Sequence, residues 1–109
     1  PPQSRQQITR MKNVLTYIRN NYGEPITLDE LAAVAGMSPR YFCRAFAALT
    51  GRTPIAYLNY YRIECACERL TLTDKSVTEI AFACGFNDMS YFSRVFKQLK
   101  GTTPTAYRN

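Results

Sequence analysis

The sequence contains no histidine, and its four cysteines include no pair spaced Cys-x-x-Cys. The chain therefore lacks the spacings that usually hold structural zinc. Cys65 and Cys67 lie two residues apart on a predicted helix, where side chains at this spacing point in different directions. We expect the reduced thiols of a cytoplasmic protein, with no disulfide framework, no metal site and no cofactor.

The sequence also lacks a long apolar run. No stretch approaches the roughly 18–20 apolar residues that span a bilayer, so we expect no membrane association. The first ten residues, Pro1–Arg10, are polar and basic and do not form a signal-peptide pattern. Their abrupt start indicates a fragment cut at a linker.

Signatures of catalysis are missing too. There is no histidine to act as a general base and no glycine-rich loop to hold a phosphate. Glu64 and Glu68 lie one helical turn apart, but we expect both carboxylates to be solvated. The sequence thus argues against an enzyme.

What the sequence does have is an excess of positive charge. Fourteen Lys and Arg residues against eight Asp and Glu residues give a net charge of +6 and a pI near 9.4. This excess favours a polyanionic partner, most often nucleic acid, although an ordinary basic protein can carry it as well. With 46% hydrophobic residues among 109, the chain is expected to fold.

Helix signals recur along the chain, whereas strand signals are weak. Apolar residues at three- and four-residue steps predict an amphipathic helix over residues 5–22, ended by Gly23–Pro25. The predicted apolar stripe consists of Ile8, Met11, Leu15, Ile18 and Tyr22.

Three further helices are predicted before residue 73. A capping box at Thr27–Glu30 opens a short helix, which Gly36 ends as a left-handed C-cap. A second helix runs over 38–49 and a longer one over 54–72. The apolar residues predicted on the short and the long helix are Leu31, Val34, Ala35, Tyr57, Leu58, Tyr61, Cys65, Leu70 and Leu72.

The chain then repeats itself. The stretch YFCRAF at Tyr41–Phe46 returns as YFSRVF at Tyr91–Phe96. A second capping box, Ser76–Glu79, lies 49 residues after the first, and one extra residue changes the offset to 50. Gly85 repeats Gly36. Each copy is a short capped helix, a glycine turn and a longer helix, which is the helix-turn-helix unit.

The longer helix of each unit has one apolar face, which is expected to pack on the short helix. The predicted inward residues are Phe42, Ala45, Phe46 and Leu49, then Phe92, Val95, Phe96 and Leu99. The opposite faces carry Arg40, Cys43, Arg44 and Ala47, then Met89, Ser90, Ser93, Arg94 and Lys97. Arg44 and Arg94 occupy the same outward position in both copies, where the core has no need of an arginine.

The repeated arginine favours a DNA contact over a solvated charge. A guanidinium group can donate two hydrogen bonds to guanine O6 and N7, or bind phosphate. The small neighbours on the same faces let each helix lie close in a groove. These small residues are Cys43, Ala47, Ser90 and Ser93.

A second set of residues is predicted to contact phosphate or to lie at the edge of the interface. Arg52 stands beside the turn that precedes Pro54, and a helix N-terminus at Thr53 can receive a phosphate. The complete peripheral set is Ala47, Arg52, Thr53, Lys97 and Lys100. The helix over 54–72 spans roughly 27 Å, so the two outward helices are expected to enter successive major grooves, roughly 34 Å apart.

Taken together, these residues resemble the AraC/XylS family of bacterial transcription regulators. The resemblance runs from about Ile8 to Tyr107, and its most specific part is IAFACGFNDMSYFSRVFKQLKGTTPTAYR. It implies one all-α DNA-binding domain over 1–109 with seven helices. Two helix-turn-helix subdomains, 5–52 and 76–109, are joined in it by the linking helix 54–72.

The resemblance also implies a function. Members of the family bind promoter DNA sequence-specifically, usually activate transcription through contact with RNA polymerase, and act at the nucleoid in the bacterial cytoplasm. The family usually joins this domain to an effector-binding or dimerisation domain, commonly on its N-terminal side, although a few members stand alone. The base-contacting positions carried over from the family are Arg40, Cys43, Arg44, Met89, Ser90, Ser93 and Arg94.

Two other interpretations stay open, a protein-interaction module and a DNA-repair-associated module with a similar helical domain. The repair module would need a zinc-held cysteine cluster, which the cysteine spacings do not provide. The interaction module can be separated by salt, because DNA binding weakens steeply as the salt concentration rises and an apolar interface responds little.

Overall fold

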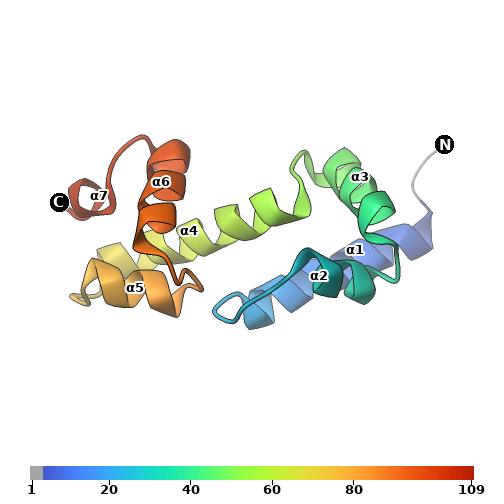
Figure 1. Cartoon of the computed structure of the whole chain (residues 1–109), viewed down its shortest axis with the longest axis horizontal. Coiled ribbons are helices and arrows are strands. Elements are labelled where there is room, and N and C mark those ends of the chain that lie inside the picture. Colours follow the sequence, from blue (N-terminus) through green and yellow to red (C-terminus); the bar gives the residue numbers. More distant parts are fainter. Residues whose placement is uncertain (1–3) are drawn as a thin grey trace. The chain divides into compact units, whose positions relative to one another are not determined.

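The structure is a computed structural model and describes residues 4–109. Seven helices and no strands occur in this part of the chain (Figure 1), which confirms the all-α prediction. The helices are α1 (Arg5–Asn21), α2 (Leu28–Ala35), α3 (Pro39–Thr50), α4 (Pro54–Leu72), α5 (Val77–Ala83), α6 (Met89–Lys100) and α7 (Pro104–Arg108). Residues 1–3 lie outside the described residues. They belong to the predicted domain and to the polar start that was interpreted as the end of a fragment.

The chain divides into two compact units. The first comprises the chain up to Tyr22 together with Ile26–Leu58, and the second comprises Gly23–Pro25 and Asn59–Asn109. The division falls within α4, and the turn after α1 belongs to the second unit. The subdomain limits expected from the sequence, 5–52, 54–72 and 76–109, stay a prediction.

The first unit is built on three helices packed in sequence, α1 on α2 and α2 on α3. Two fully buried phenylalanines of α3, Phe42 and Phe46, form its centre, with ring centroids 5.6 Å apart. Tyr57, from the start of α4, meets the Phe46 ring edge-on at 5.6 Å. Because each buried phenylalanine contributes roughly 1.5–3 kcal/mol, these rings determine which face of α3 is inside.

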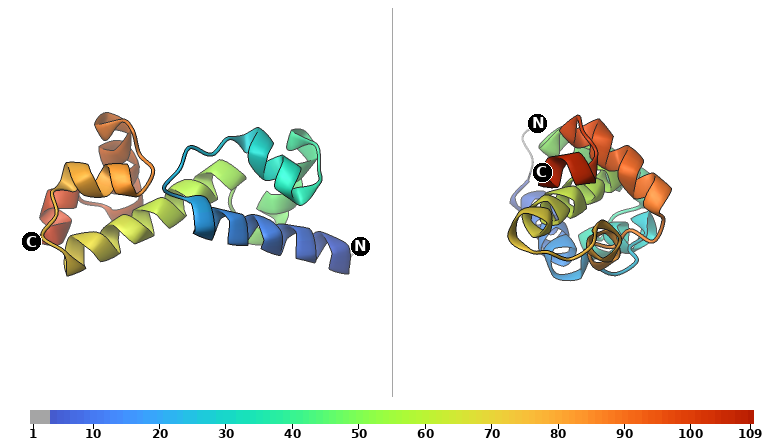
Figure 2. Two further views of the ribbon diagram at one scale, coloured as in Figure 1. Left: turned by 90° about the horizontal axis from the view of Figure 1, so that it is seen from below. Right: turned by 90° about the vertical axis from the view of Figure 1, so that its left-hand side faces the viewer.

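The second unit repeats this core with one ring more. Phe92 and Phe96 of α6 are fully buried, and Tyr107 of α7 meets Phe96 edge-on at 5.5 Å, as Tyr57 meets its partner in the first unit. Phe86, from the turn before α6, adds a contact with Phe92 at 5.0 Å. In both units a short helix leads through a tight turn into a longer one (Figure 2).

Three leucines predicted to be inside are exposed. Leu49 and Leu99 expose 45% and 38% of their surface, and each lies in the last turn of a twelve-residue helix. The helix packed against each has only eight or seven residues, so it does not cover that turn. Leu72 is 73% exposed because it is the last residue of α4 and lies beyond the packed part of that helix.

The apolar stripes of α1 and α2 are also shifted from the prediction. Val14 is fully buried whereas Ile8 is 38% exposed, so the inward face of α1 is rotated from the predicted one. On α2 Leu31 and Ala35 are buried as predicted, but Ala32 is buried as well and Val34 is only half-buried.

One buried residue of α4 is charged and was not predicted. Arg62 is 9% exposed, and its Nη2 donates to the backbone carbonyl of Glu24 at 2.8 Å. Its guanidinium carbon lies 5.9 Å from the centroid of the Phe86 ring. Burial lowers the pKa of Arg62, but an arginine stays protonated in a protein, so these contacts stabilise a permanent buried charge.

Candidate nucleic-acid interface

The first unit passes from α2 to α3 through a glycine in the left-handed conformation. Thr27 Oγ1 accepts from the Glu30 N–H at 3.1 Å and lies 3.4 Å from its carboxylate, so the predicted capping box is confirmed. Gly36 has φ +68°, and the next N–H, of Met37, donates to the Ala32 carbonyl at 3.0 Å. This φ favours glycine, as predicted, and the turn lets α3 leave α2 within three residues.

The second unit repeats this turn bond for bond. Ser76 Oγ accepts from the Glu79 N–H at 3.1 Å. Gly85 has φ +97°, and the Phe86 N–H donates to the Ala81 carbonyl at 3.0 Å. Because the same hydrogen bonds recur 49 residues later, the predicted duplication extends to the backbone geometry of the turn.

The longer helices α3 and α6 begin at different capping residues. Ser38 caps α3 by accepting from the Tyr41 N–H at 3.4 Å, and Asp88 caps α6 by accepting from the Tyr91 N–H at 3.1 Å. Two residues separate the left-handed glycine from the helix in the first unit and three in the second, which accounts for the change of the repeat offset from 49 to 50. Both caps hold the first turn of a helix whose outer face is open to solvent.

The seven residues predicted to face bases all lie on α3 or α6, and none is buried. Five are exposed and two, Cys43 and Met89, are half-buried. The exposed residues are Arg40, Arg44, Ser90, Ser93 and Arg94. Each helix therefore presents basic and small polar side chains on one face and phenylalanines on the other.

The peripheral residues differ in how far they are already engaged. Arg52 and Lys97 are exposed, and Ala47 is half-buried. Thr53 is exposed, but its Oγ1 accepts from the Ala56 N–H at 3.2 Å, so one donor at the N-terminus of α4 is satisfied within the protein. A phosphate at that helix end would find fewer open donors than the sequence alone indicates.

Lys100 is already engaged within the protein. Its Nζ donates to both carboxylate oxygens of Glu64 at 3.0 and 3.1 Å, and this hydrogen bond raises the pKa of Lys100. Glu64 is thus ion-paired, which corrects the prediction that its carboxylate is simply solvated. A phosphate contact by Lys100 would have to compete with this pair.

Sequence reasoning missed two tyrosines beside the repeated arginines. Tyr41 and Tyr91 are 43% and 37% exposed, and neither was among the residues predicted to contact DNA. The Tyr91 hydroxyl accepts from Asn59 Nδ2 of α4 at 2.7 Å, and the guanidinium carbon of Arg94 lies 5.6 Å from the Tyr91 ring centroid. The sequence contains a signal for this pairing, because in both copies the tyrosine lies three residues before the arginine, on the same side of a helix.

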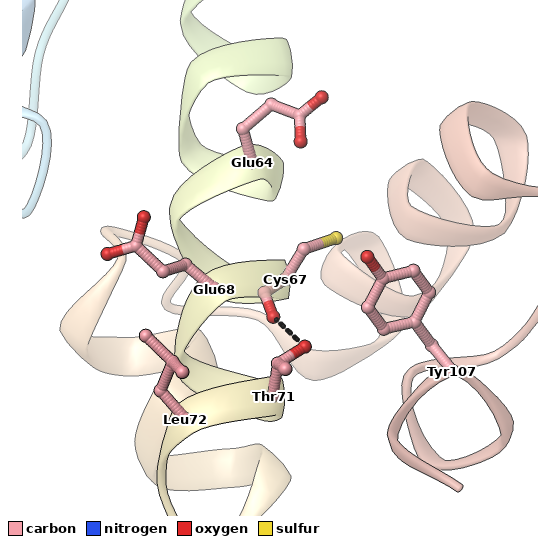
Figure 3. A pocket seen from close by; sticks show the side chains of 6 residues that line it. All are labelled: Glu64, Cys67, Glu68, Thr71, Leu72 and Tyr107. Atoms are coloured by element: carbon pink, nitrogen blue, oxygen red, sulfur yellow. Dashed lines mark hydrogen bonds between the residues drawn. The ribbon is translucent and has the colours of Figure 1, made fainter.

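The second unit also has an open hollow of about 390 Å³ between α4 and α7, but its chemistry is unsuited to DNA. Figure 3 shows Glu64 and Glu68 on the α4 side of this hollow and Tyr107 facing Cys67. Burial raises the pKa of the Cys67 thiol, and a hydrogen bond with Cys67 raises that of Tyr107. The exposed carboxylate of Glu68 would repel a phosphate backbone, whereas that of Glu64 is already paired with Lys100.

The described residues contain no group of three or more His, Cys, Asp and Glu side chains that could hold a metal ion. None of the four cysteines forms a disulfide. Burial raises the pKa of the Cys84 thiol to about 11, which keeps this sulfur protonated and unreactive at neutral pH. Within residues 4–109 no helix combines the length and the apolar character needed to cross a bilayer.

Comparison with known proteins places these observations in a family. A family profile described as a helix-turn-helix domain matches residues 31–109. The chain is 37% identical over 82 residues to RhaS of Klebsiella pneumoniae, which is named an HTH-type transcriptional activator. The matched region covers 75% of this chain and 30% of RhaS. The chain spans less than a third of the length of curated relatives such as RhaS.

Solved structures agree with this assignment. The DNA-binding domain of the transcription factor AdpA, solved with a target DNA, is 34% identical, with a TM-score of 0.86 over 91% of this chain and 89% of that one. An AraC-type DNA-binding domain protein of Chromobacterium violaceum is 29% identical, with a TM-score of 0.84 over 93% and 90%. The chain belongs to the AraC/XylS family, as a helix-turn-helix DNA-binding domain of a transcription regulator.

Proposed function

We propose that this chain binds promoter DNA sequence-specifically by inserting α3 and α6 into successive major grooves of the duplex. The observation that carries the proposal is the repeated outward arginine. Arg44 and Arg94 are both exposed, each on a capped helix whose opposite face is fully buried phenylalanine. The buried face orients the helix, so the arginine must point to solvent, where guanine O6 and N7 can accept two hydrogen bonds from it.

The composition of the outer faces supports the same proposal. Ser90 and Ser93 flank Arg94 with short side chains, and the net charge of +6 attracts the polyanion. Nineteen residues of α4, at 1.5 Å each, extend over roughly 28 Å, a length of the order of one DNA turn. A single chain would then present two recognition helices, for which most helix-turn-helix proteins need a dimer.

The proposal extends to the longer protein. RhaS is named an activator, and this chain covers only 30% of RhaS. We propose that the chain belongs to an activator that contacts RNA polymerase and carries an effector-binding or dimerisation domain elsewhere. The protein would then act at the bacterial nucleoid and would have no catalytic activity of its own.

The test begins with selection of a cognate site from random duplexes, followed by fluorescence-anisotropy titrations on the cognate site and on unrelated DNA. Arg44→Ala and Arg94→Ala should each weaken cognate binding by about 1–3 kcal/mol and change binding to unrelated DNA little. Lys75→Ala, in the exposed loop after α4, is the charge-matched control and should affect both DNAs slightly and equally. Equal losses on both DNAs would reassign the two arginines to phosphate.

Substitutions at the peripheral residues should affect binding differently from those at the base-facing arginines. Arg52→Ala should weaken binding to cognate and unrelated DNA alike and reduce the salt slope by about 1, because a phosphate contact releases a counterion. An unchanged affinity and slope would remove Arg52 from the interface. Binding that is insensitive to salt throughout would favour the protein-interaction module instead.

A further inference from the structure

Arg94 is connected to α4 by a chain of side-chain contacts within the second unit. Its guanidinium carbon lies 5.6 Å from the centroid of the Tyr91 ring, within the range of a cation–π interaction. The Tyr91 hydroxyl in turn accepts a hydrogen bond of 2.7 Å from Asn59 Nδ2. Asn59 lies on α4, thirty-two residues earlier in the sequence, so the contact fixes the ring against a different helix.

The Tyr91 ring is held from a second direction as well. The Phe86 ring lies 6.2 Å from it, and Phe86 is 3% exposed. Phe86 packs in turn on Phe92 and lies beneath the guanidinium group of the buried Arg62. The ring against which Arg94 rests is therefore anchored to the core, although Tyr91 itself is partly exposed.

The first unit holds its corresponding tyrosine in the same way with a different partner. The hydroxyl of Tyr41 accepts a hydrogen bond from Nε2 of Gln7, which lies on α1. An amide side chain thus tethers the tyrosine in both units, but the amide is a glutamine of α1 in one and an asparagine of α4 in the other. Gln7 and Asn59 do not occupy matching positions in the two copies, so the duplication alone does not explain why both tyrosines have an amide partner. The recurrence indicates that a hydrogen bond to the tyrosine hydroxyl is itself useful.

A free arginine on a helix surface samples many rotamers, and binding must order it. A ring that already holds the guanidinium group removes part of this ordering cost before DNA arrives. Tyr91 has no need of its hydroxyl for packing, since Phe92 and Phe96 already fill the core. The hydroxyl–amide bond is best explained by the position that it gives the ring.

We propose that Tyr91, tethered by Asn59, is a positioning residue that pre-orients Arg94 toward the base edge. The inference rests on the proposed function, because it assigns the ring a role in the contact that Arg94 makes. Tyr91 acts through Arg94 and does not itself bind the base. Asn59 acts one step further back, through Tyr91.

The experiment measures the ratio of cognate to unrelated DNA affinity for single and double variants. Tyr91→Phe keeps the ring but removes the hydroxyl that accepts the hydrogen bond from Asn59. Asn59→Leu removes the donor of the same hydrogen bond. Each should lower the ratio by about 2–10-fold, and the two together should lower it no further than either alone. In an Arg94→Ala background, Tyr91→Phe should have no additional effect.

Tyr41→Phe is the matched control, because it cuts the tether of the first unit and should leave the effect of Arg94→Ala unchanged. Circular dichroism checks that every variant is folded. NMR relaxation of the Arg94 Nε–Hε group in the DNA-free protein gives a direct readout. Tyr91→Leu, which removes the ring, should make this group more mobile.

Several results would overturn the inference. Tyr91→Phe could weaken unrelated DNA equally, which would make its hydroxyl a phosphate ligand. Its effect could add in full to that of Arg94→Ala, or the Arg94 group could be equally mobile without the ring. If Arg94→Ala itself left the ratio unchanged, the proposed function would fail for this helix and the positioning role with it. A loss with Arg94→Ala and none with Tyr91→Phe would defeat the positioning role alone.

Discussion

The two helix-turn-helix units have the same core but differ on the outer face of the longer helix and at the turn. Both have a capping box, a left-handed glycine, two fully buried phenylalanines and a tyrosine edge-on to the second of them. They diverge on the outer face of the longer helix, where Cys43 of the first unit corresponds to Ser93 of the second. They also diverge at the turn, where half-buried Met37 corresponds to buried Phe86.

This comparison separates the scaffold from the interface. Positions that are alike and buried are required by the fold, because their side chains fill the core of each unit. Positions that are unlike and exposed can define a different base sequence for each unit. On the outer faces of α3 and α6 an arginine and a tyrosine are alike in both units and yet exposed. We propose that the arginines contact DNA and that the tyrosine of the second unit positions its arginine.

The largest expected effect tests whether the two cores are equivalent. Phe46→Ala and Phe96→Ala each remove a fully buried ring at the same repeat position, so each should lower the free energy of unfolding by about 3–5 kcal/mol. Urea denaturation followed by circular dichroism measures both. A cost in one unit less than half that in the other would show that the shared phenylalanines do not play equal parts.

A smaller effect concerns the glycines that end α3 and α6. Gly51 and Gly101 have φ values of +82° and +77°, and a methyl group added at either would meet no atom within 4 Å. The cost of Gly51→Ala and of Gly101→Ala is therefore backbone strain alone, about 1–2 kcal/mol, and should be the same in both units. Thermal unfolding provides the measurement, and a stabilising substitution at either site would contradict the left-handed geometry.

The smallest effect should be confined to the second unit. The ion pair of Lys100 with Glu64 is partly exposed, so Lys100→Met should cost about 0.2–1 kcal/mol of unfolding free energy, and Lys97→Met should cost less. Because the hydrogen bond to Glu64 raises the pKa of Lys100 above 10.5, the difference from wild type should persist below that pH and vanish as the pH rises through the raised value. A difference that grew at alkaline pH would refute the pairing.

The repeat made most of the fold predictable from the sequence. The capping box, the left-handed glycines and Pro54, which returns as Pro104, each appeared twice, so a signal that is weak alone was checked by its copy. The prediction was wrong about burial at positions where contacts between distant helices, and not the local sequence pattern, determine whether a side chain is buried. Leu49 and Leu99 continue the apolar period, but the partner helices are too short to cover them. The buried Arg62 depends on a carbonyl thirty-eight residues away, which no local pattern reveals.

The candidate site was predictable to a similar depth. Helical period alone placed the arginines outside, and the structure has both exposed. The tethers of Tyr41 and Tyr91 were not predictable, because Gln7 and Asn59 lie thirty-four and thirty-two residues from their partners in sequence. The engagement of Lys100 was hidden for the same reason. The residues predicted to contact bases were visible in the sequence, whereas the side-chain contacts that join distant positions were not.

The central claim is that each unit contacts base edges through its own arginine. Methylation interference at guanine N7 on a selected cognate site tests it most directly. For the wild type, two groups of sensitive guanines should appear, about one helical turn apart. Arg44→Ala should abolish sensitivity in one group and Arg94→Ala in the other. A single group for the wild type, or loss of the same group in both variants, would contradict the account.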